Sequence, residues 1–158
     1  IPKSIHMNKA VSLYKFDGYW RDAGTIESLY NANMDLVDDP DFLGLNVSKY
    51  LPIYSKSLNL NPHVILSKGR VNNAVIADGC LINGTVRRST VAYETVIEAG
   101  AQVIDSVILP NVVIGANSYI KGVIVNKGVI IPENYRCESK EIIVVTDDNM
   151  LEVGEIYE

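Results

Sequence analysis

The sequence predicts a mainly β protein whose larger part is a parallel β-helix of about four coils. Three observations lead to this prediction. Apolar residues recur in three series that advance together along the chain, and small or polar residues separate them. Valine and isoleucine are abundant, whereas the chain holds only two Phe and one Trp. That composition favours strands built from β-branched residues.

The repeat extends from residue 64 to residue 132. Two of the series advance by 15, 17 and 16 residues, and the third advances by 15, 17 and 17. Series that keep step in this way predict a coil with three short sides, stacked on its neighbours as parallel strands. The series are, in order, Ala74-Val75-Ile76, Ser89-Thr90-Val91, Ser106-Val107-Ile108 and Gly122-Val123-Ile124; Leu81-Ile82, Val96-Ile97, Val113-Ile114 and Val129-Ile130; and Val71, Val86, Val103 and Ile120.

Short polar or small residues recur between the apolar positions, where the predicted coil turns its corners. Glycine and asparagine relieve strain there because they readily adopt left-handed backbone conformations. Four coils stacked about 4.8 Å apart would form a prism about 20 Å long. An antiparallel sandwich would show hairpin turns without a common phase, so we disfavour it. The corner pairs are Asp78-Gly79, Asn83-Gly84, Ala99-Gly100 and Gly115-Ala116.

Residues 1–39 carry a different pattern, a strand followed by a helix. Apolar and polar residues alternate over Val11–Phe16, which indicates a half-buried strand. After the turn signal Asp17-Gly18, Thr25 is a suitable N-cap for a helix that ends at Asp38-Asp39-Pro40. Since a strand needs a neighbour, we expect residues 1–39 to be the end of a larger domain. Helical spacing joins Ile26, Leu29, Tyr30, Asn33, Leu36 and Val37.

Residues 40–63 are predicted as a linker, and residues 64–158 as the β-helix domain with a C-terminal strand. The repeat stops after Pro132, and Glu141–Thr146 is expected to form a buried strand. That strand would return along the prism or pair with the larger domain. Four apolar residues are the expected anchors of the linker, since long segments without structure are uncommon in compact domains. They are Tyr50, Leu51, Ile53 and Tyr54.

Composition and charge exclude several classes of function. A net charge of −5 disfavours a nucleic-acid or anionic-membrane partner held by bulk charge. Cys80 and Cys137 lack the spacing of a metal or redox site and fit a reducing compartment. His6 and His63 are isolated, and no third group completes a triad. Without a membrane-spanning apolar run or a signal-peptide pattern, the expected location is the cytoplasm.

The strongest candidate for a ligand-binding motif is the stretch Gly18-Tyr-Trp-Arg-Asp-Ala-Gly-Thr25, between the predicted strand and helix. Ligand-binding residues of α/β folds commonly lie at such a junction. Asp22 offers a hard oxygen ligand suited to Mg²⁺, and Tyr19 and Trp20 offer stacking faces with polar tips. From the residues alone, a turn-forming Asp22 and a packed Tyr19-Trp20 pair remain the commoner interpretation.

Residues 18–36, which run from Gly18-Tyr-Trp-Arg-Asp-Ala-Gly-Thr25 to Asn33-Met-Asp-Leu36, resemble a segment of the bacterial glucose-1-phosphate adenylyltransferase (ADP-glucose pyrophosphorylase) family. In that family the segment joins an α/β nucleotidyltransferase domain to a left-handed, hexapeptide-repeat β-helix. The Tyr-Trp-Arg-Asp-x-Gly-Thr core separates it from guanylyl- and thymidylyltransferases, which vary there. The resemblance runs from about Tyr14 to Leu151 and includes Asp78–Val86, Asp105–Pro110 and Ile142–Thr146.

The resemblance implies a catalytic, metal-binding role for Asp22, which would hold Mg²⁺ together with an Asp of the nucleotidyltransferase domain. Tyr19 and Trp20 would lie beside the sugar-nucleotide pocket as substrate-binding residues. Ala23 stands where the family more often has Val, a small loss of packing volume. The family's Gly-rich nucleotide loop, its sugar-phosphate lysine and its first catalytic Asp are absent from these 158 residues. We therefore expect this chain alone to be inactive.

The implied activity is the synthesis of ADP-glucose and pyrophosphate from ATP and glucose 1-phosphate, for glycogen biosynthesis. This chain would be the regulatory and oligomerising part, in a tetramer of identical or different subunits. Arg87 and Arg88 are candidates for binding a phosphorylated effector, although scattered solvated charge is the commoner explanation of such residues. Lys68, Arg70 and Lys121 would complete that patch.

Two other functions stay open at this point. A paralogous subunit with a decayed active site would regulate a catalytic partner, and the residues that decide this lie outside the chain. A hexapeptide-repeat acyltransferase would place a catalytic His on a loop between coils, but no His lies between Val64 and Pro132.

Overall fold

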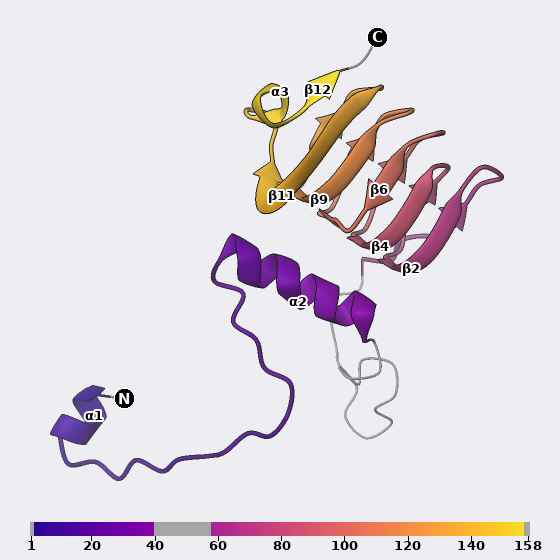
Figure 1. Ribbon diagram of the computed structural model, residues 1–158. Helices are drawn as coiled ribbons and strands as arrows, with labels where there is room; N and C mark the ends of the chain where they lie inside the picture. Colours follow the sequence, from indigo (N-terminus) through magenta and orange to yellow (C-terminus); the bar gives the residue numbers. More distant parts are fainter. Residues whose placement is uncertain (1, 40–57, 157–158) are drawn as a thin grey trace.

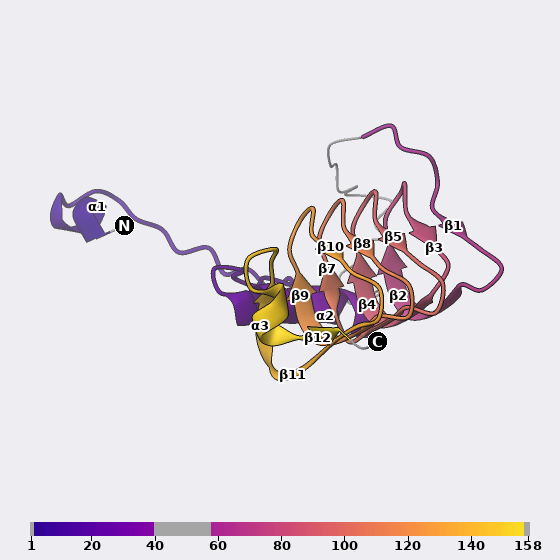
Figure 2. The same cartoon turned by 90° about the horizontal axis from the view of Figure 1, so that it is seen from above.

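The computed structural model describes residues 2–39 and 58–156. Its main body is a left-handed parallel β-helix of about five coils, stacked as Figures 1 and 2 show. The mainly β fold predicted from the sequence is thus confirmed, with one coil more than the repeat indicated. One side of the prism is a sheet of five short parallel strands in the order β1-β3-β5-β8-β10. They are β1 (Val64–Ile65), β3 (Leu81–Ile82), β5 (Val96–Ile97), β8 (Val113–Ile114) and β10 (Ile130–Ile131).

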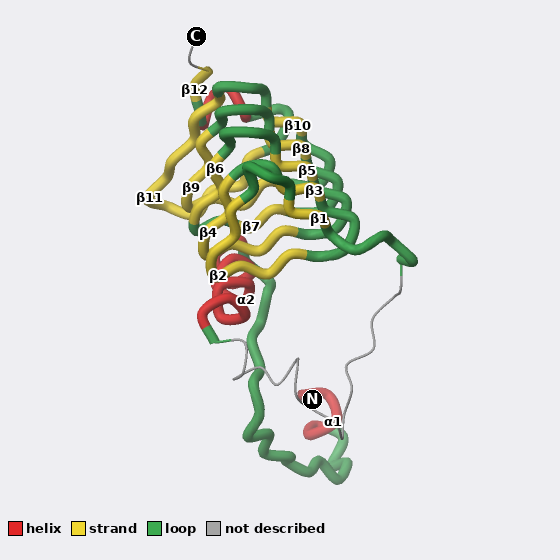
Figure 3. Tube along the Cα trace, turned by 90° about the vertical axis from the view of Figure 1, so that its right-hand side faces the viewer, coloured by secondary structure: helices red, strands yellow, loops and turns green. Residues whose placement is uncertain are grey.

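The other two sides share one sheet, whose long strands bend around a corner of the prism (Figure 3). Its bends fall at residues with positive φ that stack on one another: Asn73 (45°), Arg88 (44°), Asp105 (45°) and Gly122 (73°). Asparagine, aspartate and glycine tolerate this conformation, so Arg88 is the unusual member. The strands are β2 (Arg70–Ile76), β4 (Thr85–Val91), β6 (Gln102–Ile104), β7 (Val107–Ile108), β9 (Tyr119–Val125) and β11 (Tyr135–Val145).

The predicted corner residues divide into two kinds. Gly79 and Gly100 have φ of 75° and 78°, the left-handed conformation expected of them. At Gly84 and Gly115, glycine is required because a side chain would have no room. A Cβ on Gly84 would collide with the carbonyl oxygen of Ala101 in the next coil, and one on Gly115 would lie 2.6 Å from the amide nitrogen of Glu133.

The pairing register corrects the last step of two predicted series from 16 to 17 residues. Val107 pairs with Ile124, and Val113 pairs with Ile130, so the alignments of Ser106 with Gly122 and of Val113 with Val129 are wrong by one residue. The third series is confirmed throughout. The error arose because Val123-Ile-Val125 and Val129-Ile-Ile131 are runs of three β-formers, which fit two phases equally well.

Inward-facing branched side chains fill the prism from end to end. Each stacks on its counterpart one coil away, and burial of each contributes about 1.5–3 kcal/mol relative to exposure. The side chains with less than 2% exposure include Ile82, Ile97, Ile108, Ile114, Ile120, Ile131, Val86, Val103 and Tyr135.

Thr95 places a hydroxyl in this core, and its Oγ1 has no hydrogen-bond partner within the described residues. A buried hydroxyl without a partner costs free energy, since it has lost its bonds to water. We expect Thr95→Val, which keeps the shape and removes the hydroxyl, to raise the free energy of unfolding by about 1 kcal/mol. Urea unfolding followed by circular dichroism measures this. A lower stability of the variant would mean that the hydroxyl is satisfied.

Helix α2 (Ile26–Asp38) covers one side of the prism and confirms the predicted helix (Figure 1). Thr25 is its N-cap, and Oγ1 of Thr25 accepts a hydrogen bond of 3.1 Å from the Ser28 amide. Met34 and Val37 are buried against Val107 and Ile124 of the β-helix. Met34, which lies at helical spacing between Tyr30 and Val37, was missed as a packing residue.

The predicted strand Val11–Phe16 is wrong, because these residues form neither strand nor helix. Their side chains are exposed, and that of Leu13 is 96% exposed. A strand is stable only when a second strand takes up its backbone hydrogen bonds, and none of the described residues does so here. A short helix, α1 (Pro2–His6), precedes this stretch. Residues 58–63 are irregular, whereas the predicted linker anchors Tyr50, Leu51, Ile53 and Tyr54 lie outside the described residues.

The C-terminal part departs from the prediction in its topology. Strand β11 pairs in parallel with β9 as a fifth coil, so the repeat does not stop at Pro132, and the predicted strand Glu141–Thr146 is the second half of β11. A register shift between Glu138 and Ile143 and the polar residues around it hid this coil from the pattern. Helix α3 (Met150–Val153) and strand β12 (Glu155–Ile156), antiparallel to β11, follow at this end.

Candidate functional site

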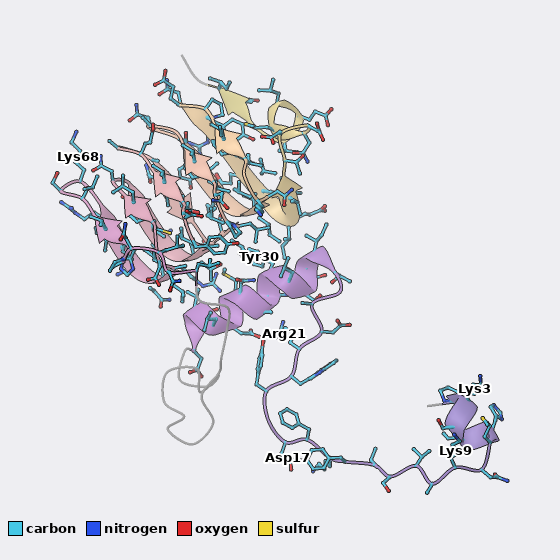
Figure 4. All side chains as sticks on the ribbon, turned by 180° about the vertical axis from the view of Figure 1, so that it is seen from behind. Lys3, Lys9, Asp17, Arg21, Tyr30 and Lys68 are labelled. Carbon is cyan, nitrogen blue, oxygen red and sulfur yellow. The ribbon has the colours of Figure 1, made fainter. Side chains whose placement is uncertain are left out.

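The Tyr19–Thr25 motif lies beside α2, and its first residues and the end of the helix border an open hollow of about 410 Å³. Asp22 is not among the residues that line this hollow. The hydroxyl of Tyr19 donates to Oδ2 of Asp35 at 3.1 Å, and Nη2 of Arg21 lies 2.8 Å from the same oxygen. Figure 4 shows Arg21 beside the helix. Partial desolvation and the bond to Asp35 raise the pKa of the Tyr19 hydroxyl. The hollow is lined by Gly18, Tyr19, Trp20, Arg21, Asp35, Asp38 and Asp39.

Trp20 is 76% exposed, so the alternative in which it is a core residue is wrong for the described residues. An exposed indole next to a hollow is available for stacking on a ligand. Tyr19 is less exposed, and its ring closes the same hollow.

Asp22 holds the turn that starts α2. Its Oδ1 accepts a hydrogen bond of 3.0 Å from the amide of Gly24, which is the turn-forming role that the residues alone suggested. Its Oδ2 accepts none from the described residues, so one hard oxygen is free. That donor suits Mg²⁺, which takes one or two carboxylates and completes its shell with phosphate oxygens and water. No group of three or more potential metal ligands occurs among residues 2–39 and 58–156.

Arg88, the predicted effector residue at the strained corner, binds the last turn of α2. Its Nε and Nη2 donate to the two carboxylate oxygens of Asp38 at 2.8 and 2.6 Å, and its Nη1 donates to Asp105 at 3.2 Å. The Arg88 guanidinium holds the pKa of the Asp38 carboxyl below its usual value. Tyr30, also from α2, donates to the backbone oxygen of Asp105 at 2.7 Å (Figure 4).

The structure therefore divides the predicted basic patch. Arg87 is exposed on the adjoining side of the prism, where the register places it two coils from Lys121, about 10 Å away. Lys121 lies 2.6 Å from Glu138. Arg70 starts the first strand of this side and donates to the backbone of Ser67 and Gly69, whereas Lys68 lies in a turn (Figure 4).

Arg136 is an additional cation on that side, and sequence reasoning missed it. Its guanidinium lies 4.4 Å from the centre of the Tyr119 ring, and Glu138 accepts a bond of 3.4 Å from it. It belongs to the fifth coil, which the repeat did not predict.

The remaining candidates, two cysteines and two histidines, are not among the residues that line the hollow. Cys80 and Cys137 are buried free thiols, and burial raises the pKa of both, which makes them poor nucleophiles. His6 and His63 are exposed. Within the described parts of the chain, no helix is long and apolar enough to cross a membrane.

The stacked three-sided coils define the class as a hexapeptide-repeat β-helix protein. Residues 63–141, half of the chain, match the family described as "GlmU-like, C-terminal hexapeptide", and the chain belongs to this family. Over a larger part of its length, the chain is similar to curated proteins named glucose-1-phosphate adenylyltransferase. That of Clostridioides difficile (strain 630) is 44% identical over 113 residues, which are 72% of this chain and 29% of that protein.

Two further relatives extend the match. The glucose-1-phosphate adenylyltransferase of Bacillus cereus (strain Q1) is 39% identical over 133 residues, 84% of this chain and 35% of that protein. That of Bacillus cytotoxicus is 36% identical over 151 residues, 96% of this chain and 39% of that protein. The chain thus spans about a third of the length of these relatives, and the resemblance drawn from its motifs is confirmed.

Proposed function

We propose that this chain is the C-terminal, regulatory and oligomerising part of a cytoplasmic glucose-1-phosphate adenylyltransferase of glycogen biosynthesis. The whole enzyme would make ADP-glucose and pyrophosphate from ATP and glucose 1-phosphate. One observation carries the proposal. A match over 151 of 158 residues must include the Tyr19–Thr25 motif and α2 as well as the coils, so the similarity is more than that of any β-helix.

In this proposal a phosphate oxygen of glucose 1-phosphate attacks the α-phosphorus of ATP, and pyrophosphate leaves. Asp22, through its free Oδ2, and an Asp of the nucleotidyltransferase domain would hold Mg²⁺. That ion, when bound, supplies charge neutralisation at the phosphates. Gly24 fixes Asp22 through the turn hydrogen bond, and Asp35 fixes Tyr19, so that Tyr19 and Trp20 present their rings to the sugar nucleotide.

The β-helix would act as a scaffold for assembly and supply no chemistry. Its short-stranded side carries an outward row of apolar side chains, with Val64, Leu81 and Ile130 substantially exposed. A flat apolar row of this kind favours contact between subunits, in keeping with a tetramer of identical or different chains.

A phosphorylated effector would bind at Arg87, on the side of the prism where Lys121 and Arg136 both pair with Glu138. Arg88 already has two carboxylate partners, so Arg87 is the stronger candidate of the predicted pair. We expect Arg87→Glu in the complete enzyme to weaken binding of a sugar-phosphate activator. The activator concentration that gives half-maximal activation should rise at least about tenfold. Lys127→Glu, an equal charge change at an exposed turn, is the control. An unchanged activator response of Arg87→Glu would dismiss the site.

Two other functions have less support. A subunit with a decayed active site is disfavoured because Asp22 is retained with one oxygen free. An acyltransferase is disfavoured because the coils contain no His.

The proposal is tested by release of pyrophosphate from ATP and glucose 1-phosphate. A polypeptide that joins this chain to a nucleotidyltransferase domain should form ADP-glucose and prefer ATP over GTP, UTP and dTTP, and the 158-residue chain should form none. A preference for another nucleotide would contradict the assigned substrate. ADP-glucose formed by the 158-residue chain would contradict the division into domains.

A further inference from the structure

Arg88 joins two parts of the molecule that lie 50 residues apart in the sequence. Its Nε and Nη2 donate to the two carboxylate oxygens of Asp38 on the last turn of α2. Its Nη1 donates to the carboxylate of Asp105 in the next coil. Bidentate pairs of this kind fix orientation as well as distance. Lysine could not reproduce them, since it offers a single point of charge.

Arg88 makes this contact from an unusual backbone conformation. Its φ of 44° belongs to the left-handed region, whereas the corner positions stacked around it hold Asn73, Asp105 and Gly122. Arginine has no conformational advantage there, and a strained residue persists only where its surroundings hold it. The corner directs the Arg88 side chain toward α2, whereas Arg87 lies on the neighbouring side of the prism.

Asp35 and Asp38 of α2 together connect Arg88 to the Tyr19–Thr25 motif. Asp35 and Asp38 are three residues apart, so they lie on one face of α2. Asp35 binds Tyr19 and Arg21, Asp38 binds Arg88, and both carboxylates line the hollow that Tyr19 and Trp20 close. One face of the helix therefore contacts the motif through one carboxylate and the β-helix through the other.

Two further contacts fix α2 to the same corner. The Tyr30 hydroxyl donates to the backbone oxygen of Asp105, and the Thr90 hydroxyl donates to Asn33 at 3.1 Å. These contacts locate the middle of the helix. The last turn, next to the hollow, depends on Arg88, which alone among the described residues joins Asp38 to the coils by an ion pair.

We propose that Arg88 is a positioning residue, which locks the last turn of α2 to the β-helix and so fixes the Tyr19–Asp22 segment relative to the coils. A displacement of the coils, for example on assembly or effector binding, is then transmitted to the segment that carries Asp22. The consequence for catalysis rests on the proposed function, whereas the lock itself does not.

Trp20 is the only Trp in the chain, and its fluorescence anisotropy reports on the lock directly. The variant is Arg88→Asn, because Asn73 occupies the equivalent corner and tolerates its conformation. We expect Arg88→Asn and Asp38→Asn each to lower the steady-state anisotropy of Trp20 in the 158-residue chain by about a third, and the double variant to add nothing further. Arg87→Asn, the matched control, should leave it unchanged. Equal anisotropy in Arg88→Asn and the original chain would overturn the lock.

The same variants in the complete enzyme test the link to catalysis. Arg88→Asn should lower kcat about tenfold while KM for ATP changes less than twofold, because misplacement of Asp22 affects reaction more than substrate binding. Arg88→Lys should recover only part of the loss. Reduced anisotropy with unchanged kcat would overturn the link. If the original enzyme forms no ADP-glucose, the proposed function fails, and the anisotropy result still decides the lock.

Discussion

Replacing Asp22 with Asn in the complete enzyme is expected to lower turnover by about a hundredfold or more. The substitution removes the charge that would hold Mg²⁺ and keeps an oxygen that can accept the bond from the Gly24 amide. The turn before α2 should therefore remain, and the loss should fall on the chemical step. The measurement is kcat for ADP-glucose formation at saturating Mg²⁺, with circular dichroism to confirm the fold.

The matched control is Asp17→Asn. Asp17 is also exposed, lies in the same segment and pairs with Lys15 at 3.3 Å, but it is outside the motif. Its substitution should leave kcat within twofold of the original, since surface ion pairs contribute little. If Asp22→Asn keeps near-normal turnover at saturating Mg²⁺, Asp22 has only the structural role of its turn.

The second large effect concerns neighbouring residues of β10. Ile131 is 1% exposed and Ile130 is 64% exposed, because successive side chains of a strand point to opposite faces. We expect Ile131→Ala to lower the free energy of unfolding by about 2–5 kcal/mol, since it leaves a cavity in the prism. Ile130→Ala, the same chemical change one residue away, should alter it by no more than about 0.5 kcal/mol.

Urea unfolding of the two variants measures both values. The comparison also tests the step of 17 residues from β8 to β10. A step of 16 would place Ile130 inside and reverse the order of the two effects, which would contradict the pairing of Val113 with Ile130.

The sequence predicted those parts of the fold in which burial repeats at fixed intervals. Val71, Val86, Val103 and Ile120 keep one phase because each has at least one polar neighbour that limits the register. Val129-Ile-Ile131 has no polar residue to set the phase, and the step was misjudged there. The fifth coil was missed for the opposite reason, since Arg136, Glu138 and Lys140 interrupt its apolar pattern.

The contacts around the candidate site could be predicted from the sequence only in part. Tyr19 and Trp20 line the hollow beside α2, whereas Asp22 does not line it, and the roles assigned to these three residues stay predictions. The ion pair between Arg88 and Asp38 joins residues 50 positions apart, and local patterns carry no signal for such a pair. Arg88 was therefore grouped with Arg87 as exposed charge, although the corner between them sends the two side chains to different sides of the prism.

The C-terminal end of the prism has a consequence for polymerisation. A stack of parallel coils can in principle grow without limit, because each last coil presents open backbone groups to another chain. Strand β12 pairs antiparallel with β11 at Tyr135 and Arg136. The Tyr135 hydroxyl also donates a hydrogen bond of 2.8 Å to the backbone oxygen of Met150 in α3. At Tyr135 and Arg136, β12 occupies the edge of β11 that a further parallel coil would use. This pairing therefore hinders the addition of a further chain along that part of the β11 edge.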